Sequence, residues 1–119
     1  MVLLQISFDI SSECYGIYNS LDAAMLECMF PREQAEKLDK LPGLCWKLWT
    51  IQPNECKAAG FYLFKTLADA ESHACYAKKN YPKAPRLTNF KTEFYDIMES
   101  LSLITRAPIT SPANPCIVK

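Results

Sequence analysis

The chain has 119 residues, half of them hydrophobic and 22% charged, which is the size and balance of one globular domain with a single core. Thirteen lysine and arginine residues balance thirteen aspartate and glutamate residues, so no basic excess favours nucleic-acid binding. The N-terminal segment is apolar but lacks the positive charges of a signal peptide, and no apolar run approaches a membrane span. We therefore expect a soluble, cytoplasmic protein with no nucleic-acid or membrane partner.

Cysteine, histidine and glycine usage argues against several kinds of site. The six cysteines form no CxxC pair, and on a helix the only histidine, His73, points away from Cys75. We expect reduced thiols, several of them in the core, and no metal site. Three scattered glycines leave no phosphate-binding loop, so no nucleotide cofactor is expected either. The cysteines are Cys14, Cys28, Cys45, Cys56, Cys75 and Cys116.

Hydrophobic periodicity indicates four strands and two main helical segments. Alternating apolar residues are typical of strands, whereas apolar side chains three or four positions apart are typical of helices. Pro31 lacks an amide hydrogen, so it interrupts or restarts the first helical segment, and Pro42 with Gly43 ends it. The expected elements in chain order are a strand at 2–10, a loop at 11–20, a helix at 21–30, a second helical piece at 32–41, strands at 44–51 and 58–65, a helix at 67–79, a loop at 81–85, a strand at 87–98 and a helical turn at 99–106.

This order is β-α-β-β-α-β, the ferredoxin-like α+β arrangement, in which both helices cover one face of an antiparallel sheet. The strands nevertheless carry apolar residues on both faces, since Trp46 and Leu48 alternate with Cys45 and Trp49. An apolar sheet face left in water would form a large sticky patch, so we expect a homodimer that pairs sheet against sheet. Residues 1–105 are taken as one domain and residues 106–119 as a proline-rich tail.

The two middle strands are expected to form a hairpin that turns near Asn54. In such a hairpin, a glycine in one strand makes room for a large ring opposite it. The expected cross-strand pairs are Trp49 with Gly60, Lys47 with Tyr62, and Cys45 with Phe64.

The hairpin and its flanks resemble the YdhR-like monooxygenase family. The resemblance is most specific over residues 42–64 and extends from the first strand to the last. It implies a dimeric α/β barrel similar to the antibiotic-biosynthesis monooxygenases, which oxidise polyketide-type phenols or anthrones with O2 and need no flavin, haem or metal. Two segments depart from the family pattern, a longer stretch at 14–30 and the tail after Thr105. The residues that fit the pattern are Pro42, Gly43, Trp46, Lys47, Trp49, Gly60, Tyr62 and Phe64.

Three residues are candidates for catalysis in a pocket between the sheet and the helices. His73 shares a helical stripe with alanines that leave room beneath the helix, and its imidazole suits proton transfer near neutral pH. Lys47 or Tyr62 would stabilise a developing oxyanion. The candidate substrate-pocket residues are Trp46, Trp49, Phe8, Phe64 and Tyr95.

The same residues also have a purely structural interpretation. The aromatic strand residues then pack across the sheet, and Lys47 lays its stem over Trp49 while its ammonium stays in water. His73 then lies at the edge of the core with one hydrogen bond.

Three functions remain open at this point. The first is a cofactor-independent oxygenase for an aromatic or polyketide-like molecule, in which a base such as His73 removes a proton and the resulting carbanion reduces O2. The second is a cofactor-free cyclase or isomerase of the same fold, in which the pocket mainly positions a reactive chain. The third is a non-catalytic dimer that binds a small molecule.

Overall fold

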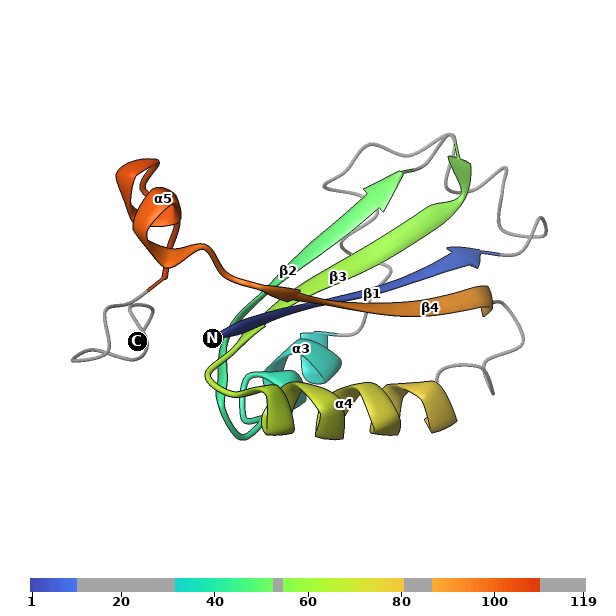
Figure 1. Ribbon diagram of the computed structural model, residues 1–119. Coiled ribbons are helices and arrows are strands. Elements are labelled where there is room, and N and C mark those ends of the chain that lie inside the picture. The colour runs from blue at the N-terminus through green and yellow to red at the C-terminus, as the bar shows by residue number, and fades with distance from the viewer. Residues whose placement is uncertain (11–31, 53–54, 81–86, 110–119) are drawn as a thin grey trace.

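The computed structural model describes residues 1–10, 32–52, 55–80 and 87–109. In this part of the chain four strands form one antiparallel sheet in the order β2-β3-β1-β4, with α3 and α4 on one face (Figure 1). This topology confirms the ferredoxin-like prediction. The expected segments at 11–31, the turn at Asn54, the loop at 81–85 and the tail from 110 lie outside the described residues. The elements are β1 Val2–Ile10, α3 Arg32–Leu38, β2 Leu44–Gln52, β3 Lys57–Phe64, α4 Leu67–Asn80, β4 Leu87–Asp96 and α5 Glu99–Ile104.

Two helices end earlier than the sequence pattern predicts. After α3 the amide of Leu41 donates to the carbonyl of Leu38 at 3.0 Å, so the chain tightens to a three-residue turn before Pro42. At the end of α5 the backbone of Arg106 adopts a φ of 67°, a left-handed conformation that a helix cannot continue through.

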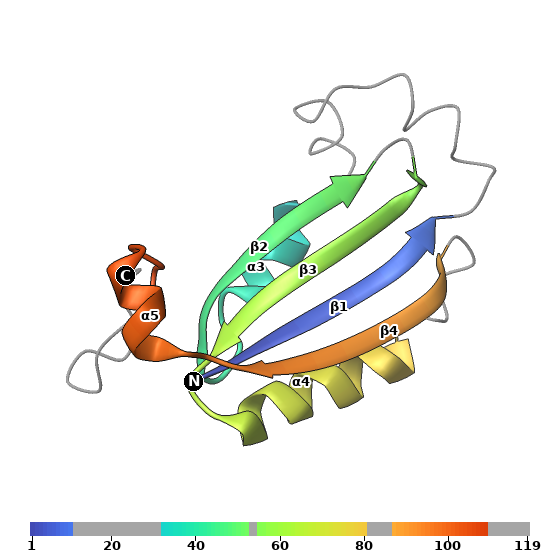
Figure 2. The same cartoon turned by 45° about the horizontal axis from the view of Figure 1, so that its top comes forward.

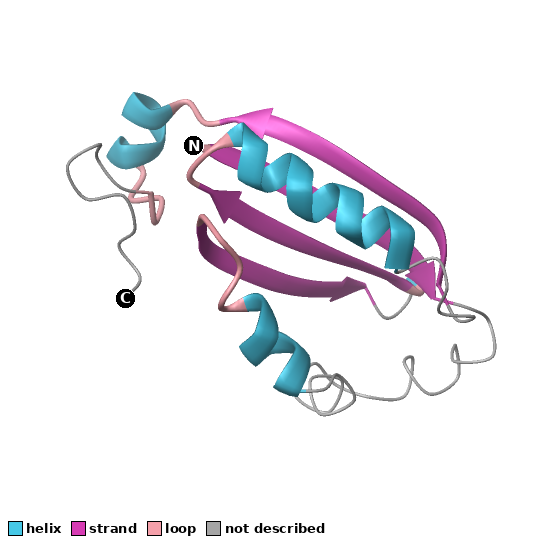
Figure 3. Ribbon diagram, turned by 90° about the horizontal axis from the view of Figure 1, so that it is seen from below, coloured by secondary structure: helices cyan, strands magenta, loops and turns pink. Residues whose placement is uncertain are grey.

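The main core lies between the sheet and α4, which packs on β1 and β3 (Figure 3). Alternation along β1 directs every second side chain toward the helix, and three alanines of α4 let the helix approach the sheet closely. The buried members of this cluster are Val2, Leu4, Ile6, Tyr62, Phe64, Ala70, Ala74 and Ala77.

The register of the β2–β3 hairpin is the expected one over most of its length. Trp49 pairs with Gly60 and Lys47 pairs with Tyr62, as predicted. The predicted pairing of Cys45 with Phe64 is wrong, because Leu44 takes that place and the register shifts between Leu44 and Trp46. A bulge inserts an extra residue on one strand and turns its neighbours. Cys45 and Trp46 consequently both join the cluster on the other side of the sheet, around Leu63 and Ile109.

The face of the sheet turned away from α3 and α4 is covered only in part by the described residues. At one end the indole nitrogen of Trp46 donates to the carbonyl of Pro108 at 2.8 Å, and Ile109 is buried there. Elsewhere on this face Leu48 and Tyr95 are 55% and 42% exposed. α5 lies beyond the end of the sheet and has no buried residue (Figure 2). No helix in the described ranges is long and apolar enough to cross a membrane.

Candidate active site

Lys47 lies on β2, on the face of the sheet that carries the helices, and its side chain crosses Gly60 on the neighbouring strand. A Cβ added at Gly60 would lie 2.9 Å from Lys47 Cε and 3.1 Å from Tyr62 Cε1. The glycine therefore makes room for the stem of the lysine as well as for the neighbouring ring. Lys47 Nζ is 3.4 Å from the ring centroid of Trp49 and 4.6 Å from that of Tyr62.

The surroundings of Lys47 favour its neutral form. Burial lowers the pKa of Lys47 from 10.5 to about 7, because the ammonium loses hydration that the aromatic rings replace only in part. Within the part of the chain that the structure describes, the side chain of Lys47 forms neither an ion pair nor a hydrogen bond. Near neutral pH the amine and the ammonium are therefore both populated.

His73 is directed into the core by the alanine stripe of α4 and is only 4% exposed. Its ring centroid lies 4.8 Å from that of Tyr62 and 6.0 Å from that of Phe64. Both ring nitrogens are fully buried and have no hydrogen-bond partner among the described residues. Burial and, to a smaller extent, the charge of Lys47 lower the pKa of His73 to about 4, so the imidazole is neutral at physiological pH.

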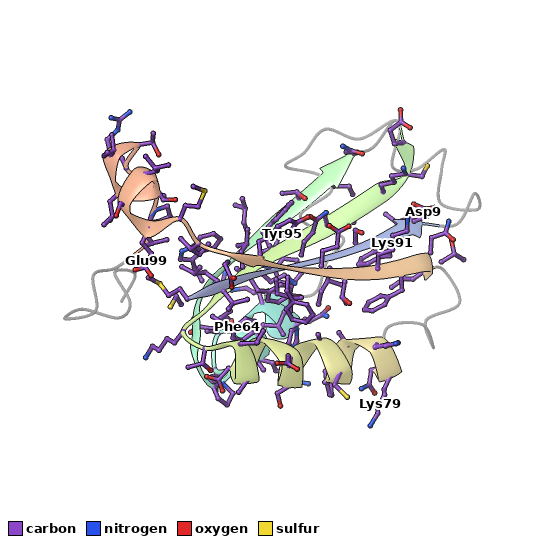
Figure 4. All side chains as sticks on the ribbon, viewed as in Figure 1. Asp9, Phe64, Lys79, Lys91, Tyr95 and Glu99 are labelled. Atoms are coloured by element: carbon purple, nitrogen blue, oxygen red, sulfur yellow. The ribbon has the colours of Figure 1, made fainter. Side chains whose placement is uncertain are left out.

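A pocket of about 260 Å³ opens beside His73, between the turn after α3, the end of β3 and α4 from Asp69 to Tyr76. His73 provides one wall and Phe64 another. Figure 4 places Phe64 between the sheet and α4. Asp69, Ser72 and Tyr76 follow the same side of the helix, at the i, i+3 and i+7 spacing. The lining residues are Leu41, Pro42, Phe64, Asp69, Ser72, His73 and Tyr76.

One wall of this pocket is held in place by the start of α4. The amide of Asp69 donates to Thr66 Oγ1 at 3.2 Å, and the Thr66 hydroxyl lies 3.0 Å from Asp69 Oδ2, which together cap the helix. Gly43 has a φ of 74°, and a Cβ at this position would lie 2.1 Å from Asp69 Oδ2. Only glycine therefore fits both the turn and the close approach to the carboxylate.

Residues 3–108 match the model of a protein family described as "Putative mono-oxygenase ydhR". The chain belongs to the YdhR family. Comparison with curated protein sequences gave no match. Because the family match spans almost all the described residues, the pocket, His73 and Lys47 all lie within the family's domain.

The fold of this YdhR-family chain is similar to those of solved structures named as antibiotic biosynthesis monooxygenases. One, a "putative antibiotic biosynthesis monooxygenase" from Deinococcus radiodurans, is 15% identical, with a TM-score of 0.58 over 83% of this chain and 94% of that one. A second, named "antibiotic biosynthesis monooxygenase", is 14% identical, with a TM-score of 0.55 over 82% and 98%. A third, from Nitrosomonas europaea, is 17% identical, with a TM-score of 0.52 over 82% and 99%.

The structure brings the three candidate catalytic residues of the YdhR-family chain together around one ring. Lys47 Nζ and the His73 imidazole both lie within 5 Å of the centroid of Tyr62, which is itself buried. Of the candidate pocket residues, Phe64 lines the pocket and Trp49 contacts Lys47.

The other three candidate pocket residues lie elsewhere. Trp46 is on the opposite face of the sheet, where it contacts Pro108. Phe8 packs against a separate cluster around Ile10 at the far end of β1. Tyr95 also lies on the opposite face (Figure 4), and its hydroxyl donates to Gln5 and Glu93. The bond to Glu93 raises the pKa of Tyr95.

The described residues contain neither a cluster of metal-binding side chains nor a disulfide. Within those ranges no group of three or more histidine, cysteine, aspartate or glutamate side chains is placed to hold a metal ion. Cys45 and Cys56 are buried, Cys75 is exposed, and no disulfide joins these three.

Proposed function

We propose that this YdhR-family chain is a cofactor-independent monooxygenase that oxidises an aromatic or polyketide-like small molecule in the pocket beside His73. The observation that carries the proposal is His73, which lines that pocket and whose two ring nitrogens are buried without a hydrogen-bond partner among the described residues. A buried polar group without a partner costs about 1–3 kcal/mol of stability, so its presence beside a cavity favours a ligand that supplies the missing hydrogen bonds.

The pKa values of the two basic groups suggest separate roles. Moving a proton from a phenol with a pKa of about 10 to an imidazole at about 4 costs about 8 kcal/mol, whereas moving it to an amine at about 7 costs about 4 kcal/mol. Lys47 is therefore the better proton acceptor. It does not line the pocket, so we propose that the substrate extends from the pocket past Tyr62 to the amine, where the ammonium that forms would pair with the substrate anion. His73 would orient the substrate, because a neutral ring nitrogen can accept a hydrogen bond from the substrate hydroxyl.

The proposed oxidation needs no external reductant. After deprotonation, a carbanion such as that of an anthrone transfers an electron to O2, and the two radicals combine. The substrate CH2 group becomes a carbonyl, one oxygen atom enters the product and the other leaves as water, together with both hydrogens of the CH2 group. The apolar pocket wall formed by Phe64, Leu41 and Pro42 would shield the radical pair from water.

Turnover of anthrone under air, under nitrogen and under 18O2 tests this proposal. We expect product only with O2, incorporation of one labelled oxygen atom, and a fall of about two orders of magnitude or more in the His73→Ala and Lys47→Met variants. Lys57→Met, which alters an exposed lysine on β3, is the matched control. Turnover under nitrogen would favour the cyclase or isomerase alternative. Saturable binding with no product under any gas would favour the ligand-binding dimer.

We further propose that the protein is a homodimer that pairs the partly exposed sheet faces. Leu48 and Tyr95 leave apolar surface on that face, and α5 presents Leu101 and Ile104 to solvent. Exposed apolar surface of this kind is typical of an interface. Light scattering coupled to size-exclusion chromatography should give twice the monomer mass for the wild-type chain and a shift toward monomer for Leu48→Glu. A wild-type protein that stays monomeric at tens of micromolar would contradict the proposal.

A further inference from the structure

We propose that Lys47 is a carbonyl-reactive amine, which condenses with planar aldehydes or ketones to form a covalent imine at Nζ. This reaction lies beyond the oxygenase proposal, because it requires neither O2 nor an acidic C–H group in the ligand. The argument rests on the contacts of Lys47 with Trp49 and Tyr62 and on the space provided by Gly60.

The position of the amine differs from that of an ordinary surface lysine. Nζ lies 3.4 Å from the centroid of Trp49 and 4.6 Å from that of Tyr62, so two aromatic faces border it. An ammonium bordered by two aromatic rings loses part of its hydration, and the ring contacts that replace it are weaker than its bonds to water. No described carboxylate pairs with the nitrogen, so within those ranges only the two ring contacts favour its charged, non-nucleophilic form.

The amine is bordered by rings but is not sealed. Lys47 is neither fully buried nor fully exposed. Trp49 is 41% exposed, so the approach to the amine runs along an accessible aromatic face. A flat, conjugated carbonyl compound fits that approach because it can stack on the indole.

The titratable groups that face the amine support its reactivity. Tyr62 reaches it from β3, and His73 on α4 is close enough for the two charges to repel each other. The imidazole, with a pKa of about 4, is neutral at pH 7, and burial lowers the pKa of Lys47 to about 7. Desolvated lysines of this type form Schiff bases with carbonyl compounds in other proteins.

The covalent step balances without an oxidant or reductant. The lone pair of neutral Nζ attacks the carbonyl carbon and forms a C–N bond, while the carbonyl π electrons move to oxygen, which takes up a proton. The C–O bond of this carbinolamine then breaks, and the oxygen leaves as water. The product is a cationic C=N bond between the ligand carbon and Lys47 Nζ.

The test is reductive trapping on the full chain with 2-naphthaldehyde and sodium cyanoborohydride under nitrogen, followed by peptide mass spectrometry. At pH 7 an exposed lysine is roughly one part in 10³ unprotonated, whereas Lys47 is about half unprotonated. Lower intrinsic nucleophilicity offsets part of this gain, so we expect labelling at Lys47 at least about tenfold faster than at Lys57 or Lys65. Its rate should level off above pH 8, whereas the exposed lysines should keep gaining up to pH 10.

The labelling pattern of the wild-type protein decides whether the proposal stands, and the variants serve as controls. Labelling spread evenly over the exposed lysines, or an unlabelled Lys47 in a chain that remains folded by circular dichroism, overturns the proposal. Lys47→Arg should lose the fast label, while Lys57→Arg should keep it. Because trapping is performed without O2, an inactive oxygenase with a rapidly labelled Lys47 would disprove the oxygenase function and leave this inference standing.

Discussion

Replacing Lys47 with methionine should stabilise the protein, and the gain should be larger at low pH. Methionine keeps most of the stem over Gly60 and removes the amine. The pKa of Lys47 is about 7 in the folded chain and 10.5 in the unfolded chain. Between these values the unfolded chain binds a proton that the folded chain does not, so the free energy of unfolding rises with pH. Integrated over pH, the burial of Lys47 lowers the free energy of unfolding by about 5 kcal/mol at pH 6 and by about 2 kcal/mol at pH 9.

Attraction between the ammonium and the two rings opposes this penalty. A desolvated cation over aromatic faces gains about 2 kcal/mol, so the net advantage of Lys47→Met at pH 6 should lie between about 3 and about 5 kcal/mol. At pH 9 the amine is mostly neutral in the fold, and the advantage should stay near about 2 kcal/mol. Desolvation of the ammonium therefore outweighs its ring contacts, and the stability difference between Lys47→Met and the wild type narrows as the pH rises.

The assay is urea unfolding followed by tryptophan fluorescence at pH 6, 7.5 and 9. All samples need one protein concentration, because association would otherwise change the apparent stability. Lys57→Met removes an exposed lysine elsewhere on the sheet and is the matched control. A Lys47→Met variant less stable than the wild type at pH 6 would refute the reasoning, since it would mean that Trp49 and Tyr62 stabilise the ammonium more than burial destabilises it.

Three further substitutions test other parts of the structure. His73→Phe should raise the free energy of unfolding by about 1–3 kcal/mol, because it removes two unpartnered nitrogens. In urea titrations the wild type, but not this variant, should lose stability as the pH falls from 6.5 to 4, since only the unfolded imidazole is protonated in that window. Gly43→Ala should cost about 2 kcal/mol or more in thermal unfolding, from left-handed strain and the contact with Asp69; an unchanged melting temperature would contradict this. Trp46→Phe loses the bond to Pro108 and should cost about 1 kcal/mol, with faster hydrogen exchange at the amides of Ala107 and Ile109.

Strand alternation explains why much of the sheet could be predicted from sequence. The pairs Trp49–Gly60 and Lys47–Tyr62 follow once the hairpin turn is placed, because each strand repeats every two residues. The bulge at Cys45 breaks that repeat without any glycine or proline to signal it. A period of two therefore predicts the middle of the hairpin correctly and its far end incorrectly.

Long-range packing explains what sequence reasoning missed at the site. Tyr76 lies three positions after His73, so helical spacing could have indicated that the two share a side, and Ser72 lies three positions after Asp69 and four before Tyr76. That Pro42 forms the opposite wall depends on how the turn after α3 approaches α4, which no local pattern specifies. The contact of Trp46 with Pro108 joins residues 62 positions apart, and it takes the indole to the face away from the pocket.

The two basic groups near Tyr62 are difficult to explain as parts of a scaffold. A phenylalanine at position 73 would fill the same space without leaving two buried nitrogens unpartnered, and a methionine at position 47 would cross Gly60 without a desolvated amine. Each polar group therefore lowers stability where an apolar one would raise it; both lie beside the ring of Tyr62, and His73 also lines the pocket. Strain and unsatisfied polar groups that cluster in this way are typical of sites selected for binding or chemistry rather than for packing. If both His73→Phe and Lys47→Met stabilise the fold while abolishing ligand binding or turnover, the same two side chains account for the stability cost and for the function.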